Sequence, residues 1–182
     1  KQKTAYEIST RDWSSDVCSS DLVLRLRELL PTNFDLVQLE CRARMSRAGL
    51  WLRIGRGAEA LREYEGVIDL TATWAGKAPP EKTLKGFEAD SHWLAAHISE
   101  GLGEFTKAIS HLERVVEQAP QVNRNAALLR LLVVHLRLRD LPGARRAAER
   151  IQNDVRIAAE ALRLLGEGER QLQRGPQIGV PN

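Results

Sequence analysis

The stretch Gly101–Pro120 (GLGEFTKAISHLERVVEQAP) decides the fold class of this 182-residue chain. Its apolar residues recur at intervals of three and four, which places them on one face of an α-helix. They are Phe105, Ala108, Ile109, Leu112, Val115, Val116 and Ala119. Gly101 and Gly103 precede the pattern and Pro120 prevents its continuation, so we expect a helix over Glu104–Ala119.

A small residue inside this apolar face predicts that the helix is one half of a packed pair. Ala108 leaves room for a second helix to approach closely. The same arrangement recurs around Ala60 and, more faintly, around Ala144. Recurrence of one pattern along a chain is typical of a repeat protein, in which each unit packs on its neighbours.

Turn signals divide the rest of the chain into further helices. Residues that favour helix starts include Asn33, Pro142 and Asp154. The expected helices cover about 33–53, 57–74, 83–102, 124–139, 142–152 and 155–165, after a short helical remnant at 23–30. None of these segments alternates apolar and polar residues as a strand does, so we expect an all-α fold of antiparallel helix pairs.

Two of these helices have faces that can be assigned from their spacing. In the helix over 33–53, the residues expected to face the core are Leu36, Leu39, Ala43, Leu50 and Ile54. In the helix over 155–165, the expected apolar face holds Val155, Ala158, Ala159, Leu162 and Leu165, and a polar face holds Arg156, Glu160, Arg163 and Glu167. A polar-backed last helix is what a stack of repeats needs at its end.

The two ends of the chain differ in character from the middle. Residues 1–22 lack helical or strand periodicity and resemble a translated sequencing adapter, because Lys1–Glu7 and Asp12–Leu22 match its two constant ends. We therefore expect 1–22 to be a disordered, non-native segment, and the native protein to have lost its N-terminal part. Residues 23–165 form the expected helical domain, and 166–182, rich in Gly, Gln and Pro, are expected to be a flexible tail.

Composition narrows the classes of partner and compartment. The formal net charge is +3, and both signs are interleaved along each helix, which does not predict nucleic-acid binding. The longest apolar run, Ala126–Leu138, is interrupted by charged residues and is shorter than the ~20 residues of a membrane span. Outside 1–22 the only cysteine is Cys41, which fits a reducing compartment, and we expect a cytoplasmic protein.

No arrangement of residues in the sequence predicts catalysis. His92 and His97 are five residues apart and do not share a helical face for a metal ion, and we expect surface or groove positions for the histidines. Cys41 has no histidine at a supportive spacing, and Gly101–Gly103 lacks the strand that precedes a phosphate-binding loop. We therefore expect no enzyme, no cofactor and no metal site.

The helix pairs resemble tetratricopeptide repeats, whose signature is a helix–turn–helix with small residues at fixed positions. Residues that match this signature are Ala48, Trp51, Ala60 and Tyr64 in one copy, Ala96, Ala108 and Pro120 in the next, and Ala144 in a third. The copies are irregular: Leu112 replaces an aromatic residue, and Leu132 and Ala148 are weak replacements in the third copy. Their anchors Ala60, Ala108 and Ala144 are 48 and 36 residues apart, compared with a period of about 34.

The resemblance implies a short α-solenoid with Val155–Leu165 as its C-terminal capping helix. In that family the first helix of each pair lines a concave groove that binds a peptide or a partner protein. Transferred to this chain, the groove residues are Arg42, Met45, Arg53, Asp90, Trp93, His97, Glu100, Leu129, Val133 and Arg137. The Lys/Asn arrangement that grips a C-terminal carboxylate in some members is absent, so binding of chaperone tails is not expected.

Two alternatives stay open at this point. The chain could be the regulatory or sensing tail of a larger signalling protein, such as a kinase or a transcription regulator, whose N-terminal part is missing. Trp93 could either line the groove or act as a wedge between neighbouring helix pairs, because it lies about 100° from the stripe through Leu94 and Ile98.

Overall fold

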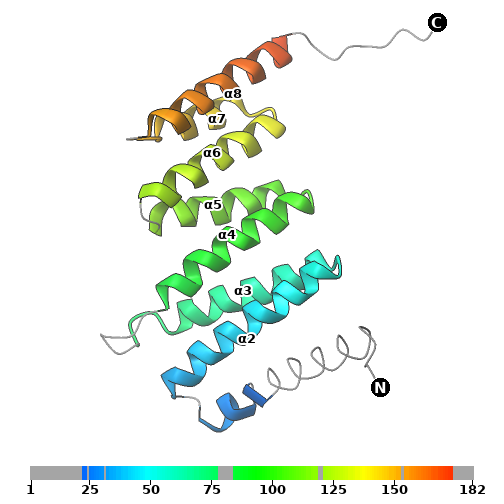
Figure 1. Ribbon diagram of the computed structural model, residues 1–182, viewed down its shortest axis with the longest axis vertical. Coiled ribbons are helices and arrows are strands. Elements are labelled where there is room, and N and C mark those ends of the chain that lie inside the picture. The colour runs from blue at the N-terminus through cyan, green and yellow to red at the C-terminus, as the bar shows by residue number, and fades with distance from the viewer. Residues whose placement is uncertain are drawn as a thin grey trace, which may run out of the picture. The chain divides into compact units, whose positions relative to one another are not determined.

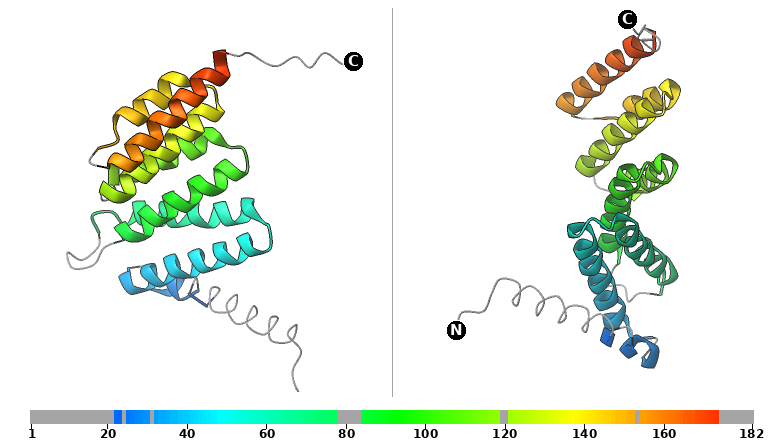
Figure 2. Two further views of the ribbon diagram at one scale, coloured as in Figure 1. Left: turned by 45° about the horizontal axis from the view of Figure 1, so that its top comes forward. Right: turned by 90° about the vertical axis from the view of Figure 1, so that its right-hand side faces the viewer.

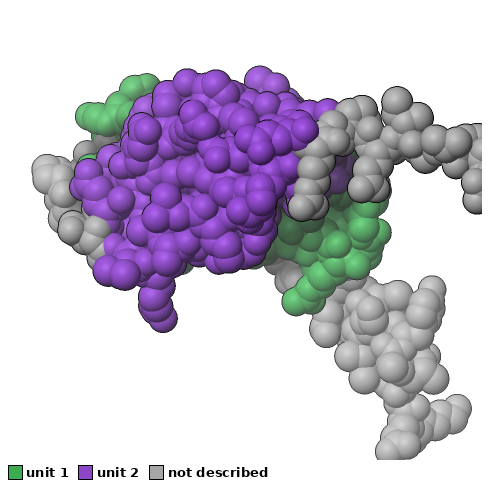
Figure 3. Space-filling model, turned by 90° about the horizontal axis from the view of Figure 1, so that it is seen from above, with its two compact units in different colours: residues 1–98 green, residues 99–182 purple. Residues whose placement is uncertain are grey.

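The computed structural model describes residues 22–23, 25–30, 32–77, 84–118, 121–152 and 154–173. Within these ranges the chain is helical and contains no strand, which confirms the expected all-α fold (Figure 1). None of the described helices combines the length and apolar character needed to cross a membrane. The expectations for 1–21 and 174–182 concern residues outside the described ranges. The chain divides into two compact units, 1–98 and 99–182 (Figure 3).

The first unit contains α2 (Phe34–Arg53), α3 (Gly57–Thr73) and most of α4 (Lys85–Gly101). Helices α2 and α3 lie side by side and are joined by a short turn (Figures 1 and 2). Asn33 caps α2 as expected, because its side-chain oxygen accepts hydrogen bonds from the backbone N–H groups of Asp35 and Leu36. A further helical stretch at 25–29 precedes α2.

Two apolar clusters form the core of this unit. One cluster contains Ala48, Ala60, Leu61, Tyr64, Ala95 and Ile98, and the other contains Phe34, Val37, Cys41, Val67 and Leu84. The expected core face of α2 was wrong: Leu39 and Ile54 are 42% and 55% exposed. Helix α2 is apolar on two opposite sides, and the side that is buried is the one that carries the small residues Cys41 and Ala48.

The second unit contains the end of α4, then α5 (Phe105–Gln118), α6 (Gln121–Arg137), α7 (Leu141–Glu149) and α8 (Val155–Gln173). Helix α6 is its centre, because it packs against α5, α7 and α8 (Figure 2). Its fully buried residues are Ala127, Leu128, Leu131, Leu132 and Val134. Helix α6 begins at Gln121, earlier than the Arg124 expected from the sequence.

Helix α8 continues to Gln173, eight residues beyond the expected end at Leu165. Residues 166–173, which were predicted to belong to a flexible tail, are therefore helical. Gly168 has a packing role in this helix, since a Cβ atom there would lie 2.6 Å from Cδ2 of Leu136 on α6. This glycine permits a close approach of two helices, and its presence does not break the helix.

One turn recurs three times along the chain. It follows α2, α4 and α6, and in each copy a residue with positive φ closes the helix: Gly55 (77°), Gly103 (79°) and Arg139 (58°). Its N–H donates to the carbonyl three residues earlier, and the next N–H donates to the carbonyl five residues earlier, at distances of 2.8 to 3.1 Å. This is the hydrogen-bond pattern of the Schellman motif.

A buried alanine follows each of these turns by five residues. Ala60, Ala108 and Ala144 each have 0% exposure, and each donates its N–H to the carbonyl four residues earlier. The turns are 48 and 36 residues apart, which is the spacing of the alanines themselves. The local helix–turn–helix unit therefore recurs in structure as well as in sequence.

Candidate partner-binding surface

The expected groove residues of the first unit are distributed over α2 and α4. Arg42, Arg53 and Asp90 are exposed, and the guanidinium carbon of Arg42 lies 6.0 Å from the ring centre of Phe87. Met45 is half-buried and packs against both core clusters, so it is mainly a core residue.

Trp93 and His97 are adjacent on α4. Both are half-buried, and their rings meet edge to face with centroids 4.9 Å apart. His92, expected at the surface or in the groove, is only 5% exposed. The pair Trp93–His97 is therefore a partly accessible aromatic feature, whereas His92 belongs to the interior.

Glu100 is buried, which the groove assignment did not anticipate. It is 8% exposed, and its carboxylate accepts from Arg130 at 2.8 Å and from Arg137 at 2.6 Å. Two guanidinium groups thus compensate the desolvation of one carboxylate. This cluster fixes the end of α4 to α6 within the second unit and leaves Glu100 with its acceptors in use.

A groove lies between α6 and α8 in the second unit. Its volume is about 450 Å³, and its lining residues are Val133, Leu136, Arg137, Arg139, Leu164, Glu167, Gly168, Gln171 and Leu172. Val133 and Arg137 are among the expected groove residues, and Leu129, also on α6, is half-buried but does not line it. The structure thus brings two of the ten expected residues into one concave feature.

Some of the charged residues that line this groove have ion-pair partners and one does not. Arg137 binds Glu100, and Glu167 accepts from Arg163 at 2.6 Å. Arg139 is exposed, and its guanidinium makes no ion pair within the described part of the chain. The groove therefore combines apolar walls with one uncommitted positive charge at its rim.

Sequence reasoning missed the α8 wall of this groove. Leu164, Gly168 and Leu172 are four residues apart, which is a helical spacing that could have revealed the wall. The glycines at 166 and 168 were instead interpreted as the beginning of a flexible tail.

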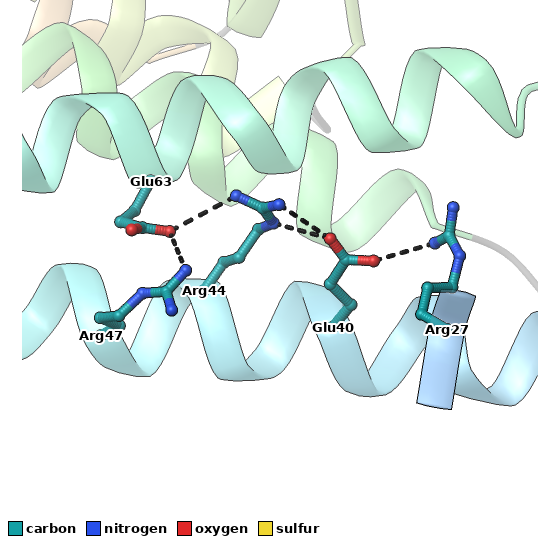
Figure 4. A network of polar contacts seen from close by, with 5 residues as sticks. All are labelled: Arg27, Glu40, Arg44, Arg47 and Glu63. Carbon is teal, nitrogen blue, oxygen red and sulfur yellow. Dashed lines mark hydrogen bonds and ion pairs between the residues drawn. The ribbon is translucent and has the colours of Figure 1, made fainter. Parts of the chain in front are cut away.

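A second polar cluster lies in the first unit and is structural. Glu40, 5% exposed, accepts from Arg27 at 3.0 Å and from Arg44 at 2.9 Å, and Glu63 binds Arg47 at 2.8 Å (Figure 4). Arg44 lies between the two carboxylates, 3.6 Å from Glu63. These contacts connect the stretch before α2, α2 itself and α3, and they bury the charges against each other.

Two further features of the described residues concern Cys41 and possible metal ligands. Burial raises the pKa of the Cys41 thiol to about 11, so this cysteine is not a nucleophile near neutral pH. No group of three or more His, Cys, Asp or Glu residues in the described ranges could hold a metal ion. No protein-family model matches the chain, and comparisons with curated proteins and with solved structures give no match.

Proposed function

We propose that this protein is a tetratricopeptide-like scaffold that binds a peptide segment of a partner protein, and that the groove between α6 and α8 is a binding site. The observation that carries the proposal is the groove itself, an apolar furrow of about 450 Å³ between two long helices. Furrows of this size and lining accommodate several side chains of a ligand.

The lining of the groove specifies the chemistry of the peptide. Val133, Leu164 and Leu172 offer apolar contacts, and Arg139 offers a positive charge without a partner in the described chain. A peptide that carries aliphatic side chains beside an Asp or Glu would match both features. Residues on two helices would then read one segment, as in helix-groove recognition.

A random-peptide phage library selected against the immobilised protein tests this proposal. We expect enrichment of sequences with an acidic residue close to two aliphatic ones. Leu172→Glu places a charge on the apolar wall and should weaken binding of a selected peptide by about tenfold or more. Arg139→Gln should weaken it by roughly threefold to tenfold and remove the preference for acidic residues.

Arg124→Gln is the matched control for the charge effect. Arg124 is an exposed arginine of α6 that does not line the groove, so its substitution should leave the affinity unchanged. If Leu172→Glu binds every selected peptide as tightly as the unaltered protein, the groove is not the site and the proposal is wrong.

A further inference from the structure

The groove between α6 and α8 is lined by opposite charges that do not bind each other. Arg137 and Arg139 line it from the end of α6 and the turn that follows, which we call the α6 wall, and Glu167 lines it from the α8 wall. Arg137 binds Glu100, and Glu167 binds Arg163. Neither Glu100 nor Arg163 lines the groove, so no ion pair in the described chain bridges its two walls.

The ion-pair cluster at the α6 wall has an excess of positive charge. The single carboxylate of Glu100 accepts from Arg130 and from Arg137, at 2.8 and 2.6 Å, and it can neutralise only one of the two guanidinium groups. The side chain of Arg137 is 54% exposed, and its remaining N–H donors can reach a ligand. Arg139 adds a second positive charge, so this wall attracts a carboxylate.

The ion-pair cluster at the α8 wall has the opposite excess. Arg163 donates to both Glu160 and Glu167, in each case at 2.6 Å, so one guanidinium lies between two carboxylates. The side chain of Glu167 is 43% exposed, and its contact with Arg163 uses only Oε1. The second carboxylate oxygen of Glu167 makes no hydrogen bond to the described residues, and this wall attracts a basic group.

The other lining residues leave this polarity unchanged. Glu169 and Arg170, the charged neighbours of Gly168 and Gln171 on α8, do not line the groove, and Glu169 binds Arg145 of α7. Charges at the edge of a partly apolar groove are screened less by salt than charges on an open surface. The side chains between the two charged walls are Val133, Leu136, Leu164 and Leu172.

We infer that the groove selects a dipolar peptide segment, in which an acidic side chain binds at the α6 wall and a basic side chain binds Glu167 at the α8 wall. This rests on the proposed peptide-binding function and names the second charge that the peptide carries. Because the two walls differ in sign, they also fix the direction in which the segment lies. A segment with two acidic residues would place one carboxylate beside Glu167, which is unfavourable.

Parallel selections from the random-peptide phage library test the inference. On the unaltered protein we expect Lys or Arg to be enriched together with acidic and aliphatic residues. Glu167→Gln keeps the shape of the side chain but removes its charge, and should abolish only the enrichment of basic residues. Arg163→Gln removes the arginine that partly neutralises Glu167, and should increase that enrichment.

Glu169→Gln is the matched control for these selections. Glu169 is also a carboxylate of α8 that binds an arginine, but it does not line the groove. Its substitution should therefore leave the selected sequences unchanged. Thermal melting of each variant verifies that the fold is retained.

The affinity of one selected peptide measures the contact with Glu167. Replacing the basic residue of the peptide by Gln should weaken binding to the unaltered protein by about twofold to fivefold, the range of an exposed ion pair. The same replacement should not change binding to the Glu167→Gln variant. Such a dependence of one change on the other identifies a direct contact, which a general loss of stability would not produce.

The outcomes distinguish this inference from the proposed function. If acidic and aliphatic residues are enriched without basic ones, or if basic ones are still enriched on Glu167→Gln, the dipolar inference is wrong and the peptide groove stands. If no sequence is enriched on the unaltered protein, the groove is not a peptide site and both proposals fail.

Discussion

Arg139 holds a backbone conformation that costs an arginine free energy. Its φ is 58°, in the left-handed region that the equivalent residues Gly55 and Gly103 occupy without a Cβ penalty. Arg139→Gly should therefore stabilise the protein by about 0.5–1 kcal/mol, measured by urea titration. Gly103→Ala, the reverse change at the equivalent turn, should destabilise it by about 1 kcal/mol. If both substitutions change the free energy of unfolding in the same direction, the two turns do not share one geometry.

Asp140 makes the start of α7 sensitive to acid, because it is the N-cap residue of that helix. Its carboxylate accepts the backbone N–H of Gly143 and contacts Nδ1 of His135 at 2.8 Å, and both contacts hold the pKa of Asp140 below its usual range. A depressed pKa contributes stability that is present above the unfolded pKa of about 3.9. That contribution is lost as the pH falls through the lower, folded value.

Asp140→Ala measures this contribution. Removal of the cap should cost about 0.5–2 kcal/mol near pH 7. The difference between the variant and the unaltered protein should shrink as the pH falls below the unfolded value of about 3.9 and through the lower, folded pKa of Asp140. Chemical denaturation at pH 7 and at a series of acidic pH values provides the comparison. A difference that is independent of pH would show that the carboxylate charge has no part in the cap.

The residues that cap helix starts were predictable from the sequence, but the arginine that closes α6 was not. Asn33 and Asp154 accept backbone N–H groups at their helix starts as their residue types indicate. Arg139 carries the turn that a glycine carries elsewhere, and an arginine gives no local signal for positive φ. Only the spacing of Ala144 behind it marked the position.

At the level of elements, α8 offers a matched pair of glycines. A Cβ atom at Gly166 would meet only the end of the Arg170 side chain at 3.5 Å, whereas one at Gly168 would meet Leu136 at 2.6 Å. Gly166→Ala should stabilise the helix by about 0.5–1 kcal/mol, the usual gain in helix propensity. Gly168→Ala should lose that gain, because α8 must shift or Leu136 must change rotamer.

Thermal unfolding of the two variants side by side is the measurement. The comparison also tests the length of α8, since both substitutions would be nearly neutral if residues 166–173 were frayed. A stabilisation of equal size at both positions would mean that Gly168 does not pack against α6.

Helix positions followed from the sequence more reliably than helix faces. Periodicity located α3 and α5 because each has one apolar side, and Ala60, Tyr64, Ala108 and Leu112 are buried as expected. In α2 apolar residues occur on both sides, so the pattern did not determine which side faces the core. In α8 the expected inner face is the one that carries the exposed Val155 and Leu162.

At the scale of the molecule, the candidate groove required knowledge of packing between distant segments. Val133 and Leu164 line the same furrow although 31 residues separate them in sequence. The resemblance supplied α6 residues for the groove, but it could not indicate that α8 forms the opposite wall. The burial of Glu100 could not be predicted for the same reason. It depends on arginines 30 and 37 residues further along the chain.

The uneven distribution of buried residues predicts a gradient of local stability within the second unit. Helix α6 buries residues on several sides because it packs against three helices, whereas the only fully buried residue of α8 is Ala161. In helical arrays with contacts only between neighbours, terminal elements open most easily. Native-state hydrogen exchange should therefore show the strongest amide protection in α6 and weak protection in α8.

Low concentrations of urea separate the local opening of α8 from the opening of α6. Helix α8 should exchange when it alone opens, whereas α6 should exchange only when its three neighbouring helices also separate. Because the larger opening exposes more surface, urea should accelerate exchange in α6 much more steeply than exchange in α8. Equal protection and equal urea dependence of the two helices would contradict the gradient.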